Sequence, residues 1–251
     1  MIKVGIIGGS GLDDPRLLKD AEEEKVITTY GEPSSALVKG KLDGIEVVII
    51  ARHGKGHTIP PTQINNRANI LALKNAGCTH ILATTACGSL REEIKRGDIV
   101  ILDQFIDFTR LRKLTFFEEF EYGAENAKHT PMGDPFSEEL REKLITSAEE
   151  LGLSFHKQGT VITIEGPRFS TRAESKMYRI WGADVVNMSV APEAILANEL
   201  GIPYAAVAMS TDYDAWKVDE NPVEWSEVLE TFLNNVENVK QLLLKVIQSY
   251  K

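Results

Sequence analysis

The sequence is poor in cysteine and has no long uninterrupted run of apolar residues. Its 251 residues include only two cysteines, Cys78 and Cys87, and no histidine or further cysteine completes a metal-binding spacing with them. Two cysteines do not make the disulfide framework of a secreted protein, so we expect free thiols, no metal and a cytoplasmic location. No segment approaches the roughly 18–20 apolar residues of a membrane span, and we expect no membrane partner.

Positive charge is scarce as well. The chain carries 28 Lys and Arg residues against 37 Asp and Glu residues, a formal net charge of −9. This acidic average argues against a nucleic-acid partner but does not exclude a local pocket for a small anion. With 43% hydrophobic and 26% charged residues, the composition is that of an ordinary globular protein whose core needs no disulfide or metal.

Apolar strands and helical patterns alternate along the chain. Short apolar runs that end in glycine or polar residues, as at 3–7 and 45–51, predict buried strands. Further strands are expected at 81–84, 99–102, 159–164, 184–187 and 204–209, and helices at 63–75, 140–151, 171–181, 193–200 and from about 223. This order predicts an α/β fold with a central, mostly parallel twisted sheet flanked by helices, and we expect one domain over residues 1–251.

Three segments add detail to this prediction. Thr171 and Glu174 form the capping-box pattern that begins a helix. The last helix carries an apolar stripe at steps of three and four residues, formed by Val228, Phe232, Val236, Val239, Leu243 and Val246. Residues 109–132 are polar and irregular, which is typical of a lid, a binding loop or a disordered segment.

Small hydroxyl residues, glycines and charged pairs follow the predicted strands. Ligands of parallel sheets bind at the carboxyl ends of strands, so these segments are expected to meet at one edge of the sheet. In chain order they are 8–11 (GGSG), 52–54 (RHG), 84–89 (TTACGS), 187–189 (NMS) and 210–214 (STDYD).

The first of these segments suit a small anion. The glycine turn around Ser10 lacks the third glycine of a dinucleotide fingerprint, and is either a plain turn or a loop whose amides and hydroxyl bind phosphate. Arg52 offers a planar two-donor fork and His53 a further donor, although such a pair also occurs as a surface ion-pairing residue. Residues 84–89 suit an oxyanion or a plain turn, and Cys87 has no acid–base partner nearby in sequence that would make it a nucleophile.

Asp212 and Asp214 give the most specific hint. Residues two apart in an extended segment point the same way, so both carboxyl groups can face one ligand. A coupled carboxyl pair can both donate and accept hydrogen bonds, which suits a purine with a 6-amino group and an N7 acceptor. A metal site, which lacks a visible third ligand, and a surface acidic pair are the competing interpretations.

Taken together, these strings resemble a known family. In addition to the five segments above, they include 57–60 (HTIP) and 165–172 (EGPRFSTR). In this order they closely resemble the trimeric purine nucleoside phosphorylase family, and within it the methylthioadenosine phosphorylases. The resemblance spans essentially the whole chain.

The resemblance implies roles for individual residues. The phosphate site would comprise Ser10, Arg52, His53, Thr85, Ala86 and Ser189. Met188 would lie against the ribose, Phe169 and Ser170 would border the purine, Asp212 would face N7 and the 6-amino group, and Asp214 would support the amino group. His129 falls where the family's mobile loop reaches a neighbouring subunit's site, so a homotrimer with sites at its interfaces is implied.

The implied reaction is phosphorolysis of methylthioadenosine to adenine and 5-methylthioribose 1-phosphate. Phosphate is a co-substrate, no cofactor is needed, and Asp212 acts as general acid toward N7. Family members that act on 6-oxopurines typically carry asparagine at this position, so an acid here favours adenine. The alternatives are a methylthioinosine or broader purine nucleoside phosphorylase, and a non-catalytic nucleotide-binding module.

The chain departs from the family pattern in two places. Trp225 stands where a smaller aliphatic residue near the 5′-substituent is expected, and it either tightens that pocket, fills a core gap or alters selectivity. The chain also ends at Lys251, before the C-terminal extension that helps to close a neighbouring site in relatives. We therefore expect a more open 5′ pocket that also admits adenosine.

Overall fold

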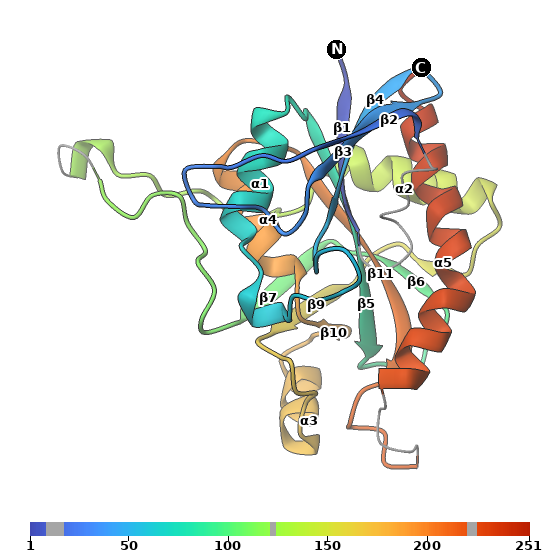
Figure 1. The fold of residues 1–251 in the computed structure, drawn as a ribbon. Coiled ribbons are helices and arrows are strands. Elements are labelled where there is room, and N and C mark those ends of the chain that lie inside the picture. Colours follow the sequence, from blue (N-terminus) through green and yellow to red (C-terminus); the bar gives the residue numbers. More distant parts are fainter. Residues whose placement is uncertain (9–17, 121–123, 220–224) are drawn as a thin grey trace.

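The centre of the structure is one mixed sheet of eleven strands (Figure 1). The structure is a computed structural model that describes residues 1–8, 18–120, 124–219 and 225–251, without the side chains of 124, 225, 227 and 234. The strands are β1 (Lys3–Gly8), β2 (Lys19–Glu24), β3 (Leu37–Leu42), β4 (Ile45–Ala51), β5 (His80–Ser89), β6 (Ile99–Ile101), β7 (Gln104–Phe108), β8 (Phe155–His156), β9 (Thr160–Ile164), β10 (Val185–Asn187) and β11 (Tyr204–Tyr213). The main order is β2-β3-β4-β1-β5-β10-β9-β7, with β11, β6 and β8 branching from β5.

Strand β5 organises the sheet around the future site. Along one edge it pairs in parallel with β11. Along the other edge it pairs first with β1, as far as Ala83, and then in antiparallel fashion with β10, beginning at Gly88. Between these stretches, residues 84–87 pair only with β11 within the described part of the chain. The sheet therefore opens where the polar 84–89 segment was predicted to bind a ligand.

Two helical layers cover the sheet. Helices α1 (Asn66–Asn75) and α4 (Val190–Glu199) pack on one face, and α2 (Glu138–Glu150) and α5 (Trp225–Gln248) pack on the other (Figure 1). Helix α3 (Arg172–Ile180) contributes Tyr178 to a third, smaller cluster. Among the described residues, the other helical turns are the 3-10 turns Pro61–Gln63 and Ala124–Asn126. The central strands, such as β1, β5 and β11, are buried on both sides because each face carries helices, which explains their continuous apolar runs.

The main sequence predictions for the fold are confirmed. The capping box of Thr171 and Glu174 is present, with each side chain accepting from the other residue's backbone N–H. Five of the six residues in the predicted α5 stripe are buried, and Val236 is half-buried. Helix α4 begins at Val190, three residues earlier than predicted. The α/β fold with a central mixed sheet and a long C-terminal helix agrees with the sequence prediction.

Two features differ from the sequence prediction or extend it. Strands β2, β3, β7 and β8 were not predicted. In β2 all six residues are exposed and charged or small, so no apolar alternation marks it. Residues 109–132 form a long segment that extends away from the sheet in Figure 1, and the 3-10 turn is the only helical or strand element among its described residues. In the described residues, no helix combines the length and apolarity needed to cross a membrane.

Candidate active site

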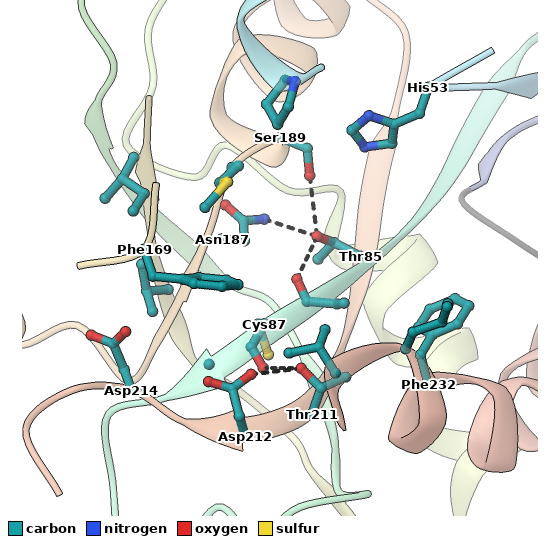
Figure 2. Close-up of a pocket in the computed structure, with 18 of the residues that line it drawn as sticks. His53, Thr85, Cys87, Phe169, Asn187, Ser189, Thr211, Asp212, Asp214 and Phe232 are labelled. Carbon is teal, nitrogen blue, oxygen red and sulfur yellow. Dashed lines mark hydrogen bonds between the residues drawn. The ribbon is translucent and has the colours of Figure 1, made fainter. Parts of the chain in front are cut away.

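A pocket lies at the opening of the sheet, beside the second half of β5. Its walls come from β5, β10 and β11, from the turn after β4, from Phe169 and Ser170 before α3, and from the first turns of α5. Figure 2 shows three regions: Thr85 and Ser189 lie on one side, Asp212 and Asp214 on another, and Phe232 on a third. The pocket thus gathers four of the five predicted polar segments, and the fifth, which contains Ser10, falls mostly outside the described residues.

Hydroxyl groups and a helix N-terminus form the first region. The Oγ1 atom of Thr85 lies 3.1 Å from Oγ of Ser189 and accepts a hydrogen bond from Asn187 over 3.3 Å. Ser189 directly precedes α4 and does not cap it with its side chain, so its hydroxyl points to Thr85 instead (Figure 2). Because a helix N-terminus carries partial positive charge, this region suits an anion.

Arg52 lines the same region, but most of its guanidinium group is engaged. Its Nε donates to Oε1 of Glu193, its Nη2 donates to Oε2 of Glu193 over 3.0 Å, and its Nη1 donates to the carbonyl of Thr84 over 2.7 Å. Three of the five N–H groups of an arginine are therefore used. Arg52 is almost fully buried, so the surface interpretation is wrong. The two N–H donors that were predicted to bind phosphate, Nε and Nη2, donate to the carboxylate of Glu193 instead.

His53 adds a neutral ring to this region. Burial, followed by the neighbouring Arg52, lowers the pKa of His53 to about 4. Its Nδ1 lies 2.9 Å from the carbonyl oxygen of Ile59, which can only accept, so Nδ1 carries the proton. A neutral ring in this tautomer presents Nε2 as a hydrogen-bond acceptor, whereas the sequence predicted a hydrogen-bond donor at His53. His57 stacks on it at 4.2 Å between ring centroids.

The second region holds the two carboxyl groups that the sequence singled out. Asp212 and Asp214 are both buried in the pocket wall. A register shift in the pairing of β11 with β5 falls between Ser210 and Asp212, and such bulges commonly redirect side chains. Thr211 donates to Oδ1 of Asp212 over 2.8 Å. The predicted juxtaposition of the two carboxyl groups is present in the structure (Figure 2).

Asp214 and Ser170 have unused hydrogen-bonding capacity. Among the described residues, neither Oδ2 of Asp214 nor Oγ of Ser170 forms a hydrogen bond of good geometry, although both atoms are buried and Ser170 lies close enough to Asp214 to lower its pKa. Burial raises the pKa of Asp214. Buried polar atoms without partners are costly, so their presence in a pocket indicates a ligand that completes them. Phe169 extends its ring beside these groups and gives a flat apolar surface (Figure 2).

Met188 is held by a glycine. Gly166 has a φ of +67°, and the sulfur of Met188 lies where a Cβ on Gly166 would be. Any other residue there would be strained and would displace Met188. Met188 lines the same pocket as the hydroxyl and carboxyl groups, and its contact with the ribose stays a prediction.

The third region is apolar and was not predicted as part of the site. Val228, Leu229 and Phe232 of α5 line the pocket together with His57 and Pro61. In the sequence, Val228 and Phe232 were predicted only as part of the apolar stripe of the last helix, because a helix face toward a pocket has the same spacing as one toward a core. Asn187, Thr211 and Glu193 were also missed as single residues, since no motif marks them.

The remaining predicted residues are placed as follows. Ala86 lines the pocket in the part of β5 that pairs with β11 alone among the described residues. Ser10 lies outside the described residues, and Trp225 begins α5 but its side chain is not described. His129 is exposed on the extended segment, packs against Phe120 at 5.6 Å between ring centroids, and does not line the pocket of its own chain.

Thiol and metal chemistry find no support here. Cys87 lines the pocket, but burial raises its pKa well above the ordinary value, which keeps the thiol protonated. Across the described residues, no three side chains of the His, Cys, Asp or Glu type are grouped to hold a metal ion. The site is therefore a pocket of hydroxyl, carboxyl and apolar groups.

Comparison with known proteins places this pocket in a family. The family model described as the phosphorylase superfamily matches residues 3–248. An S-methyl-5′-thioadenosine phosphorylase of Xenopus tropicalis is 55% identical over 98% of this chain and 88% of its own length. The corresponding protein of Danio rerio is 52% identical over the same shares.

Solved structures agree with these relatives. Methylthioadenosine phosphorylase from Schistosoma mansoni in complex with adenine superimposes with a TM-score of 0.94 at 44% identity, covering 100% of this chain and 92% of that one. A variant of the adenosine/methylthioadenosine phosphorylase from the same organism, in complex with methylthioadenosine, gives a TM-score of 0.92 at 43% identity, with the same coverage. The chain therefore belongs to the phosphorylase superfamily and, within it, to the family of the S-methyl-5′-thioadenosine phosphorylases.

Proposed function

We propose that this protein catalyses the phosphorolysis of S-methyl-5′-thioadenosine to adenine and 5-methylthio-α-D-ribose 1-phosphate. The observation that carries this proposal is one pocket with a hydroxyl and amide region for phosphate opposite a buried carboxyl pair for the base. The similarity to S-methyl-5′-thioadenosine phosphorylases over nearly the whole chain supports the same substrate. No organic cofactor or metal enters the proposed reaction.

The reaction joins these regions at C1′ of the ribose. An oxygen of phosphate forms the new bond to C1′, the bond from C1′ to N9 breaks, and its electron pair stays on the purine. Asp212 supplies a proton toward N7 and thereby makes adenine a better leaving group. The ribosyl ring passes through a cationic state that the bound phosphate stabilises electrostatically.

The residues divide by region. The phosphate is held by Thr85, Ser189, the amide of Ala86 and the remaining donors of Arg52, with His53 and Ser10 beside them. Ser170 and Asp214 bind the 6-amino group of the base, since their unpaired buried atoms need donors and acceptors. Val228 and Phe232 contact the methylthio group, which needs no hydrogen bond.

A homotrimer completes this proposal. His129 lies on a segment that extends away from its own body, and it does not line its own pocket. We place His129 at the site of a neighbouring subunit, near the ribose and the 5′-substituent. Residues 1–251 then act as one catalytic domain in the cytoplasm, with both described cysteines as free buried thiols.

The decisive experiment measures release of the base. The protein is incubated with methylthioadenosine, methylthioinosine and adenosine, each with and without phosphate, and free base is separated by chromatography. Phosphate-dependent release of adenine from methylthioadenosine is expected. Preferred release of hypoxanthine would favour the methylthioinosine alternative, and no phosphate-dependent release from any substrate would favour a nucleotide-binding module.

A further inference from the structure

Glu193 is a buried carboxylate that the proposed reaction does not use. It lies in the first turn of α4, is fully buried and does not line the pocket. Its two oxygens accept from Nε and Nη2 of Arg52, and Oε2 also accepts from the hydroxyl of Tyr204 over 2.8 Å. Through these hydrogen bonds the Glu193 carboxylate links α4 to the turn after β4 and to β11, next to the predicted phosphate region.

This contact cancels the positive charge of that region. Arg52 and Glu193 sum to zero, and His53 is neutral because its pKa lies near 4. Arg52, Glu193 and His53 together therefore carry no net charge. Attraction for phosphate comes from hydroxyl groups, the α4 N-terminus and the unused N–H groups of Arg52. At a distance, the electrostatic attraction of these groups for an anion is weaker than that of a free cation.

From this arrangement we propose that Glu193 is a positioning residue that fixes the guanidinium plane of Arg52 and limits how tightly phosphate binds, so that the bound phosphate keeps its reactivity. This inference rests on the proposed phosphorolysis. An uncompensated arginine would bind the substrate anion more tightly in its ground state, and such binding lowers KM without raising kcat. It would also withdraw charge from the phosphate that must stabilise the cationic ribosyl ring.

The test is the isosteric substitution Glu193→Gln. We expect the KM for phosphate to fall at least fivefold and kcat to fall at least tenfold, while the KM for methylthioadenosine stays within twofold. Phosphate should also raise the Tm of Glu193→Gln more than that of the wild type, because the anion replaces the missing counter-charge. Damage that is merely structural would raise the KM for phosphate or leave it unchanged, and either result overturns the inference.

A matched control lies on the same helix. Glu199 sits at the other end of α4, where it accepts from Thr115 and Phe116 and does not line the pocket. Glu199→Gln removes the same charge from the same helix. Its phosphate KM and phosphate-induced Tm shift should equal those of the wild type, and an effect as large as that of Glu193→Gln would overturn the local explanation.

A second variant covers the case in which Glu193→Gln does not fold even with saturating phosphate. The Tyr204 hydroxyl donates a hydrogen bond to Oε2 of Glu193 and so offsets part of its negative charge. Tyr204→Phe removes this hydrogen bond, and the carboxylate of Glu193 then repels phosphate more strongly. Its phosphate KM should rise two- to fivefold with the nucleoside KM unchanged, and an unchanged or lower phosphate KM overturns the inference. Wild-type protein without phosphate-dependent base release would instead refute the proposed function itself.

Discussion

Thr211 donates its hydroxyl proton to Oδ1 of Asp212 over 2.8 Å, and the same hydroxyl lies 3.2 Å from the carbonyl oxygen of Cys87. A threonine has one hydroxyl proton and donates it to only one of these two acceptors at a time, so the bond to Oδ1 orients the carboxyl of Asp212 while the Cys87 carbonyl receives no proton from it. The other oxygen, Oδ2, lies 3.0 Å from the place where a Cβ on Gly88 would be. Two neighbours therefore position the candidate general acid Asp212. Thr211 donates a hydrogen bond to its carboxyl group, and Gly88, which has no side chain, leaves space for Oδ2.

The first prediction concerns this contact. Gly88→Ala places a methyl group against Oδ2 of Asp212 and within 3.2 Å of Val186, so Asp212 must shift by a few tenths of an ångström. Small displacements of a reacting group are costly, and we expect kcat/KM for methylthioadenosine to fall about 10- to 100-fold. Gly133→Ala, whose methyl group meets open space, is the control in the same steady-state assay. Equal kinetics for the two variants would contradict the role of this contact.

The second prediction concerns Asp212 itself. Asp212→Ala removes the group that donates toward N7, and we expect kcat to fall about 10²- to 10⁴-fold, as is typical of a lost general acid. The exposed Asp134→Asn variant should behave as the wild type. Turnover of Asp212→Ala close to that of the wild type would show that the leaving group is protonated by other means.

The third prediction links Asp214 to stability. Burial raises the pKa of Asp214 in the folded state, so the protonated form is favoured there, and its contribution to stability is lost as the pH rises through that pKa. Asp214→Asn mimics the protonated form. Its Tm should exceed that of the wild type at pH 7, and the difference should vanish near pH 3.8, the ordinary pKa of aspartate. Thermal unfolding across this range measures the effect.

Asp214→Asn should lose activity while it gains stability. The amide replaces a carboxylate oxygen that accepts from the 6-amino group, and we expect kcat/KM to fall about tenfold, the value of one hydrogen bond. A variant that is both less stable at pH 7 and fully active would contradict both parts of this prediction.

The fourth prediction concerns His53. Its folded-state pKa of about 4 lies below the ordinary histidine value of 6.5, so the neutral form is favoured on folding. This contribution is present above pH 6.5 and is lost as the pH falls toward 4, by at most about 3 kcal/mol. Denaturant unfolding at pH 8 and pH 5 should show a smaller acid-induced loss for His53→Gln than for the wild type. Parallel losses in both proteins would indicate that His53 is charged in the folded state.

The fifth prediction concerns selectivity for the 5′-substituent. Val228→Thr keeps the shape of the side chain but gives the apolar region a hydroxyl that can pair with the 5′-hydroxyl of adenosine. Because apolar contacts discriminate by about 10- to 200-fold at most, we expect the preference for methylthioadenosine over adenosine to fall about tenfold. Val239→Thr, buried on the same helix away from the pocket, serves as the control. An unchanged ratio of kcat/KM values would place the methylthio group elsewhere.

Local sequence patterns determined the architecture and the composition of the site. Glycine and hydroxyl residues after apolar strands predicted the edge at which the pocket lies, because the carboxyl ends of parallel strands converge there. Asp212 and Asp214 were predicted from their spacing alone to face one ligand, and both line the same pocket. The apolar stripe of α5 was predicted as well. The sequence did not predict that Val228 and Phe232 line the pocket, because an apolar stripe does not show which surface it packs against.

The tertiary structure decided the charge of the phosphate region. The sequence places Arg52 beside His53 and indicates a donor-rich, partly cationic pocket for an anion. Glu193 lies 141 residues further along the chain, and only the packing of α4 against β5 and β11 brings its carboxylate to the guanidinium group. Burial near Arg52 also decided that His53 is neutral. Charge compensation depends on distances in space, and these are set by the fold as a whole.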